Sequence, residues 1–224
     1  MVSSIVKVFS LGSTMIKKAF LFAFLVMVMP LVAEVKVLAF AGSTRKDSYN
    51  KKLVQQAAEI ARQKGAKVTI IDLIDYPMPL YDADLEAKQK LPTFAKKLRD
   101  LMINNDVIMI ASPEYNASIS AVLKNALDWT SRGEKAEYSA DAYKGKKFAI
   151  MSASPGKMGG ARGLVHLRAI IEGAGGEVIK SQVTVPEAHK AFDAKGNLVS
   201  TELTKKLQDE VQQLLNSVPA SKGT

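Results

Sequence analysis

Short apolar segments that alternate with segments of helical periodicity constrain the fold of this chain most strongly. Residues 35–40, 106–111 and 147–152 are apolar almost throughout, which is typical of strands that are buried on both faces. Further strands are predicted at residues 67–73 and 178–185. Helices are predicted where apolar residues recur every three or four positions, at 50–64, 92–104, 118–130, 160–174 and 201–216. The alternation indicates a parallel sheet with helices on both faces.

The order of these segments predicts a single α/β domain, a flavodoxin-like doubly wound five-stranded parallel sheet with the strand order 2-1-3-4-5. In sheets of this kind, a ligand binds beyond the carboxyl ends of the strands, at the point where the strand order reverses. The first and third strands flank that point, so the loops after residues 40 and 111 are expected to share a ligand. Prolines within residues 75–82 predict a long loop without regular structure.

The loop after the first strand is rich in glycine and hydroxyl side chains, and it directly precedes a helix. Backbone N–H groups at a helix start lack partners inside the helix, and the helix dipole favours an anion there. Neutral donors come from four side chains of the loop, those of Ser43, Thr44, Ser48 and Asn50. Arg45 adds a planar cation that can bind two phosphate oxygens. The pattern predicts a phosphate site, and the alternative is an ordinary strand-to-helix turn with capping residues.

The loop after the third strand predicts contacts with a planar ring. Pro113 stiffens this loop, and Tyr115 offers a flat face or an edge to a ring. Asn116 and the neighbouring backbone amides can bind the carbonyl groups and ring nitrogens of a heterocycle. The sequence offers Glu114 no evident partner, which favours a structural role for its carboxylate over that of a general base.

The loop after the fourth strand contains Ser152, Ser154 and Gly159, and it is expected to close the same end of the sheet. Its glycines allow the backbone to approach a ligand closely. Arg162 follows the glycines and is expected either to reach a nucleotide phosphate or to face solvent.

The composition excludes several classes of chemistry. Lys and Arg number 31 against 22 Asp and Glu, but the basic residues are scattered and do not interleave with aromatic residues, so nucleic-acid binding is not predicted. The chain has no cysteine, which excludes disulfides, thiolate metal ligands and cysteine nucleophiles. Its two histidines, His166 and His189, are too few for a histidine-based metal site, so no metal is predicted.

The N-terminal residues 1–33 are interpreted as a leader outside the globular domain of residues 34–224. Lysines at 17 and 18 precede an apolar segment at 19–33, which is typical of a secretory signal, with cleavage after Ala33, or of a retained membrane anchor. The leader therefore suggests export to the periplasm or membrane attachment, with transient membrane contact through the leader. The alternative is a cytoplasmic protein with a wrongly chosen start codon.

Three motifs together resemble the NADPH-dependent FMN reductases, a family that includes bacterial quinone, azo-dye and chromate reductases. Residues 42–50 resemble the family's phosphate loop. Residues 113–116, continuing through the segment Leu-Lys-Asn-Ala-Leu-Asp-Trp at 123–129, are similar to its second motif. The glycine loop that ends in Gly159-Gly160-Ala161-Arg162 is the third match. The resemblance extends from Val35 to about residue 199.

The resemblance implies an FMN-dependent oxidoreductase that takes a hydride from NADPH or NADH and passes it to a small-molecule acceptor: a quinone, an azo compound, a metal or free flavin. It implies that the FMN phosphate is held by Ser43, Arg45, Ser48 and Asn50. The isoalloxazine ring would lie against residues 113–116, and Ser152 with residues 154–160 would border its other edge. The chemistry would be centred on the flavin, without a catalytic side chain. The family implies a homodimer or homotetramer, with Asp128 and Trp129 in a packed helix that could meet a second copy.

Two other functions remain open from the sequence. One is a flavin-binding electron-transfer module without activity toward pyridine nucleotides, which the leader motivates because an exported protein meets little NADPH. The other is a basic protein that uses this fold to bind an anionic surface without a cofactor.

Overall fold

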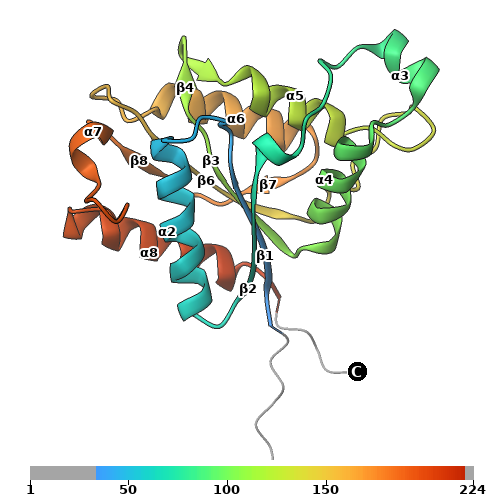
Figure 1. Cartoon of the computed structure of the whole chain (residues 1–224). Helices are drawn as coiled ribbons and strands as arrows, with labels where there is room; N and C mark the ends of the chain where they lie inside the picture. Colours follow the sequence, from blue (N-terminus) through green and yellow to red (C-terminus); the bar gives the residue numbers. More distant parts are fainter. Residues whose placement is uncertain (1–33, 220–224) are drawn as a thin grey trace, which may run out of the picture. The chain divides into compact units, whose positions relative to one another are not determined.

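The computed structural model describes residues 34–219, so the predicted leader lies outside the described residues. The central sheet has the order β2-β1-β3-β6-β7, and β8 also pairs with β6 (Figure 1). Every pairing in this sheet is parallel. The strands are β1 (Lys36–Ala41), β2 (Lys67–Asp72), β3 (Val107–Ala111), β6 (Lys147–Ala153), β7 (Glu177–Val178) and β8 (Val183–Val185). The flavodoxin-like fold and its strand order are confirmed.

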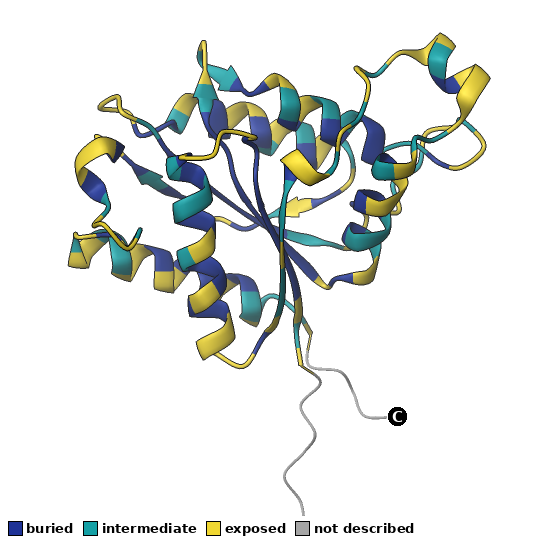
Figure 2. Cartoon of the chain, in the orientation of Figure 1, coloured by how far each residue is buried: buried dark blue, intermediate teal, exposed yellow. Residues whose placement is uncertain are grey.

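Helices cover both faces of the sheet because side chains of each strand alternate between the faces. On β1, Val37 and Ala39 face a core formed with α2 (Tyr49–Gln63) and α8 (Thr201–Asn216). Leu38 and Phe40 face a second core formed with three helices, α4 (Thr93–Asn104), α5 (Ala121–Thr130) and α6 (Ala161–Gly173). The inner strands are buried along most of their length (Figure 2).

The predicted fifth strand is divided into two. β7 pairs with the start of β6 and β8 with its end, and the chain leaves the sheet between them. There, Arg168 of α6 donates hydrogen bonds to the carbonyl oxygens of Val178 (3.1 Å) and Ile179 (2.9 Å). These contacts satisfy the carbonyl groups where the strand is interrupted, and a continuous strand over 178–185 was therefore a wrong prediction.

The segment between β2 and α4 contains more regular structure than the sequence predicted. A 3₁₀ turn, η1 (Leu73–Asp75), and a short helix, α3 (Ala83–Gln89), flank an irregular stretch. This stretch is fastened to α5, because the carbonyl oxygen of Pro79 accepts from Trp129 Nε1 (2.8 Å) and from Asn125 Nδ2 (2.9 Å). Trp129 is fully buried. The second motif therefore includes residues whose side chains hold the fold together.

Two further hydrogen-bonded elements complete the described chain: a hairpin formed by β4 (Glu114–Tyr115) and β5 (Ser118–Ile119), and a short helix, α7 (Ala188–Ala191). None of the helices within residues 34–219 combines the length and the apolar character that crossing a membrane requires.

Candidate functional site

Three loops meet at the carboxyl ends of β1, β3 and β6 and form a cleft there. Its lining includes eight residues that the sequence predicted for the site: Ser43, Arg45, Ser48, Asn50, Pro113, Glu114, Tyr115 and Ser154. Pro155, which lies within the predicted segment 154–160, also lines the cleft, as do Tyr49 and Ala153, which the sequence analysis did not select. A cleft therefore lies where the strand order reverses, as the sequence predicted, and residues of three separate segments line it.

The first loop is held rigidly between β3 and α5. The backbone N–H of Gly42 donates to the carbonyl oxygen of Ala111 (2.9 Å), and Ser120 Oγ donates to the carbonyl oxygen of Gly42 (2.6 Å). A Cβ at position 42 would lie 2.7 Å from Leu123 Cδ2. Glycine is required here because the loop backbone packs directly on α5.

The first loop and the start of α2 present donors that have no partner among residues 34–219. Ser48 is the N-cap residue with an extended backbone, yet its side chain makes no capping hydrogen bond. Within residues 34–219, Arg45 forms no ion pair and is exposed at the edge of the cleft. A free hydroxyl, a free guanidinium and first-turn N–H groups together suit a phosphate. Thr44 is exposed in the same loop but does not line the cleft.

Asn50 lines the cleft and also binds the end of β6. Its Nδ2 donates to the carbonyl oxygen of Ala153, and its Oδ1 accepts from the N–H of Ala153, both at 2.9 Å. Only 3% of Asn50 is exposed. Both ends of this amide are used within the protein, so Asn50 joins the first and third loops.

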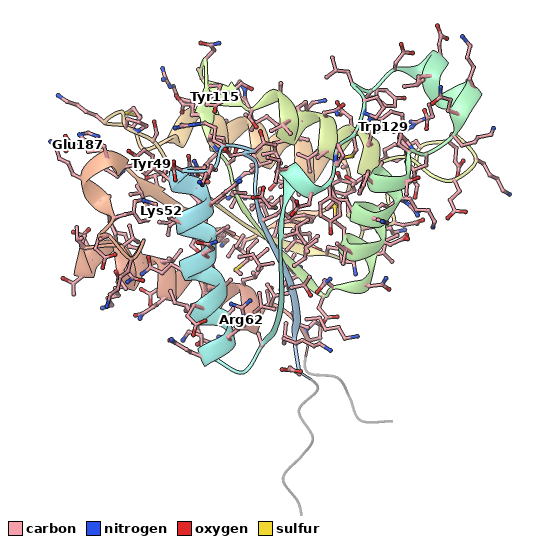
Figure 3. The ribbon with its side chains drawn as sticks, viewed as in Figure 1. Tyr49, Lys52, Arg62, Tyr115, Trp129 and Glu187 are labelled. Atoms are coloured by element: carbon pink, nitrogen blue, oxygen red, sulfur yellow. The ribbon has the colours of Figure 1, made fainter. Side chains whose placement is uncertain are left out.

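Tyr49 lies between the first loop and α7. Its ring stacks on Phe192 with centroids 6.1 Å apart, and Lys52 Nζ lies 5.8 Å from its centroid (Figure 3). The sequence could have indicated that Tyr49 belongs to the site, because Tyr49 lies between Ser48 and Asn50 in the first motif.

The second loop folds into the β4–β5 hairpin, where the sequence had predicted the first turn of a helix. Asn116 and Ala117 form its two-residue turn with φ of 50° and 65°, the backbone that a type I′ turn requires. α5 starts only at Ala121, after the N-cap Ser120. Tyr115 is 49% exposed on the hairpin, and Figure 3 places it beyond the start of α2, where Tyr49 lies.

Asn116 lies at the tip of the hairpin and does not line the cleft. It borders a separate, more apolar groove between the hairpin, α5 and α6. His166 lines the same groove, and its Nδ1 lies 2.9 Å from Ser118 Oγ.

Glu114 has partners that the sequence did not reveal. Its Oε2 accepts from the backbone N–H groups of Arg162 (3.0 Å) and Gly163 (3.1 Å), and its Oε1 accepts from Arg162 Nε (2.9 Å) and Nη2 (2.5 Å). Burial acts to raise the pKa of this carboxyl, but these hydrogen bonds and the charge of Arg162 outweigh burial and hold the pKa below its ordinary value. Glu114 is thus an ionised structural group, and Arg162 is bound to it.

The third loop is shaped by close backbone packing. Ser152 is fully buried with an unpartnered hydroxyl, and a Cβ at Gly160 would lie 1.9 Å from it. Gly159 has a φ of +59°, and a Cβ there would lie 2.8 Å from the nitrogen of Pro186. Neither Ser152 nor Gly159 lines the cleft, so of the predicted loop only Ser154 and Pro155 reach it. Within residues 34–219, no group of His, Asp or Glu side chains is placed to hold a metal ion.

The parallel sheet, its cleft at the reversal of strand order and the free donors at the start of α2 define a flavodoxin-like nucleotide-binding protein. The family profile described as NADPH-dependent FMN reductase matches residues 35–190. The chain belongs to this family, and its class of chemistry is FMN-dependent oxidation of NAD(P)H.

Known proteins similar to this chain agree with that assignment. The NAD(P)H-dependent FMN reductase of Pseudomonas aeruginosa is 34% identical over 182 residues, which cover 81% of this chain and 94% of the relative. The NADPH:quinone oxidoreductase of Arabidopsis thaliana is 36% identical over 191 residues, 83% and 91% of the two chains. Among solved structures, the flavoenzyme NAD(P)H:(acceptor) oxidoreductase FerB of Paracoccus denitrificans aligns with a TM-score of 0.69 at 28% identity, covering 82% of this chain and 97% of the other.

Proposed function

We propose that the chain binds FMN in the cleft of the three loops and uses it to carry a hydride from NAD(P)H to a quinone. The observation that carries the proposal is a pair of donors that have no partner within the described residues 34–219, the Ser48 hydroxyl and the Arg45 guanidinium, which line the same cleft as the half-exposed Tyr115. A phosphate and a planar ring are the two parts of a flavin nucleotide that such groups bind.

The first loop would bind the phosphate. Arg45 would donate two hydrogen bonds to its oxygens, Ser43 and Ser48 would donate one each, and the N–H groups of the first turn of α2 would complete the site. Hydrogen bonds to a charged group each contribute about 1.5–3 kcal/mol, and the helix dipole adds about 0.3–1 kcal/mol. These contributions are compatible with an affinity in the micromolar range or tighter, about −8 kcal/mol.

The second and third loops would orient the ring. Tyr115 offers an aromatic face, the backbone of residues 113–116 offers amide and carbonyl groups, and Ser154 borders the opposite edge. When bound, FMN supplies the hydride chemistry, so the side chains have only to fix its ring and leave one face open. NAD(P)H and the acceptor would then occupy that face in turn, which predicts ping-pong kinetics.

A quinone is the favoured acceptor because several relatives carry that activity in their names. Besides the Arabidopsis protein, the 2-hydroxy-1,4-benzoquinone reductase of a Burkholderia species is 32% identical over 177 residues and covers 90% of that relative. A planar acceptor would stack on an open ring face, whereas azo compounds, metals and free flavin remain further acceptors to assay.

The proposal extends to assembly and location. We propose a homodimer or homotetramer, which the apolar groove between the hairpin and α6 and the 64% exposed Val165 support; light scattering after gel filtration measures the mass. We also propose that residues 1–33 direct export to the periplasm or attach the protein to a membrane. Fractionation and N-terminal sequencing of the native protein separate these outcomes from a cytoplasmic protein with an intact N-terminus.

The function is tested by spectroscopy on the purified protein. FMN should produce a bound flavin spectrum, anaerobic NADPH should bleach it, and a quinone should restore it. Arg45→Ala should weaken FMN binding at least tenfold but leave riboflavin binding unchanged, because riboflavin lacks the phosphate. Protein that binds no FMN would refute the proposal, and flavin reduced only by a protein partner would favour the electron-transfer module.

A further inference from the structure

The β4–β5 hairpin is fastened to α6 by side chains at two points. Glu114 of β4 binds Arg162, and Ser118 of β5 binds His166. Arg162 and His166 are four residues apart and therefore lie on the same face of α6. The two contacts follow one another along this face, so they fix both strands of the hairpin.

The contact at Glu114 is the stronger of the two. The Glu114 side chain is 8% exposed, and it accepts four hydrogen bonds from the first turn of α6, two from backbone N–H groups and two from Arg162. A carboxylate at a helix N-terminus is favoured by the helix dipole. The hairpin also packs directly on this turn, because a Cβ at Gly163 would lie 3.2 Å from the carbonyl oxygen of Ser118.

Tyr115 lies between these two contacts. It follows Glu114 in the chain and is paired with Ser118 across the hairpin. Its backbone is therefore held on α6, and the residue lines both the cleft and the apolar groove beside it. Since α6 starts at Ala161, directly after the third loop, the same contact also fixes the distance between two walls of the cleft.

We propose that Arg162 and Glu114 form a positioning pair for the flavin reaction, which holds the Tyr115 ring at the orientation in which it stacks on the isoalloxazine. This inference rests on the proposed function. Neither residue needs to touch the ring: Glu114 is bound to α6, and Arg162, which is 62% exposed, is bound to Glu114.

A purely stabilising role makes a different prediction. If Arg162 only stabilises the fold, Arg162→Met should lower the melting temperature of the flavin-free protein but leave the FMN affinity and the flavin fluorescence of the folded protein unchanged. If the pair positions Tyr115, the same change should weaken FMN binding about tenfold and raise the residual fluorescence of bound FMN, because a loosened tyrosine quenches the flavin less.

The test is a double-mutant cycle between Arg162→Met and Tyr115→Ala, read out by FMN affinity, by fluorescence of bound FMN and by the melting temperature of the flavin-free protein. Arg162→Lys retains the charge without the two-point contact and should recover only part of the affinity. Arg62→Met is the matched control, because Arg62 is a half-exposed arginine at the opposite end of α2 (Figure 3).

The proposal predicts that Arg162→Met weakens FMN binding in the wild-type background and hardly changes it further when Tyr115 is already alanine. Additive effects of the two substitutions, or an Arg162→Met protein with wild-type affinity and fluorescence, would overturn the positioning role while the proposed function stands. Wild-type protein that binds no FMN would remove the proposed function and this inference with it.

Discussion

Asn50 and Ala153 exchange two hydrogen bonds, each 2.9 Å long, between the first turn of α2 and the end of β6. The amide side chain provides one donor and one acceptor, and the backbone of a single residue uses both. The contact joins segments 103 residues apart in the chain. It fixes the first loop relative to the third loop, and so sets two of the three walls of the cleft.

Asn50→Ala should therefore destabilise the protein more than a typical polar substitution does. It leaves the buried N–H and C=O of Ala153 without partners, at about 1–3 kcal/mol each, so we expect a loss of about 2–5 kcal/mol in urea unfolding. Asn50→Asp should be at least as harmful at neutral pH, because a carboxylate oxygen would face the Ala153 carbonyl. A loss below about 1 kcal/mol for Asn50→Ala would mean that water replaces the lost amide.

Ser48→Ala should separate ligand binding from stability. The Ser48 hydroxyl makes no capping hydrogen bond, so its removal should change the free energy of unfolding by less than about 0.5 kcal/mol. FMN binding should weaken about tenfold or more, since a hydrogen bond to a charged phosphate is lost.

The matched control for Ser48 is Ser200, the N-cap residue of α8. Its Oγ accepts from the N–H of Leu203 (3.2 Å), so Ser200→Ala should cost about 1 kcal/mol of stability and leave FMN affinity unchanged. Equal effects of the two substitutions on FMN affinity would contradict a direct contact of Ser48 with the phosphate.

Glu210 should make the protein less stable as the pH rises. Its carboxyl on α8 is fully buried; burial raises its pKa well above the ordinary value, and the backbone N–H of Val183 and the charge of Arg168 oppose this only in part. The folded state therefore holds a proton that the unfolded state releases above pH 4.5, so stability falls with pH from there up to the raised pKa, by at most about 1.4 kcal/mol per pH unit.

Glu210→Gln replaces the titrating carboxyl with a neutral amide. The free energy of unfolding of this variant, relative to that of the wild type, should therefore increase as the pH rises above about 5. Urea unfolding at several pH values measures the difference between the two proteins. Asp209→Asn, which changes an exposed carboxylate on the same helix, should show no such trend. A pH-independent difference between Glu210→Gln and wild type would show that Glu210 is ionised in the folded protein.

Ala117→Gly should stabilise the hairpin. Ala117 has a φ of 65°, a left-handed conformation that costs a residue with a Cβ about 1–2 kcal/mol, whereas glycine adopts it freely. We expect a gain of about 1 kcal/mol in thermal unfolding. Ala194→Gly, an exposed turn residue without a positive φ, should lose stability instead.

Much of the fold and most of the residues that line the cleft were accessible from the sequence because they depend on local patterns. Apolar runs such as residues 106–111 indicate strands buried on both faces, and the alternation with helical periods defines the order of the sheet. The reversal of that order then places the loops of Ser43 and Tyr115 side by side. The helix boundary at 118 was wrong because Ser118 and Ile119 pair with β4, and such pairing depends on the fold of the preceding loop.

Other features depend on contacts between distant segments. Where the fifth strand is divided, Arg168 binds the carbonyl groups of Val178, at the end of β7, and of Ile179, just after it. The burial of Ser152 requires Gly160 to pack over it. The engagement of Glu114 requires the start of α6 to lie beside the hairpin. These contacts cannot be predicted from the periodicity of apolar residues, because they join separate segments of the chain.

By itself, the sequence determined the α/β class, the order of the sheet, the chemical character of the three loops and the family, because each of these depends on residue types at short spacing. Only the tertiary structure decided which polar side chains remain available to a ligand. Within residues 34–219, the side chains of Asn50 and Glu114 are bound to backbone groups, whereas the Arg45 guanidinium and the Ser48 hydroxyl have no such partner. That division follows from which backbone groups the folded chain brings within hydrogen-bonding distance.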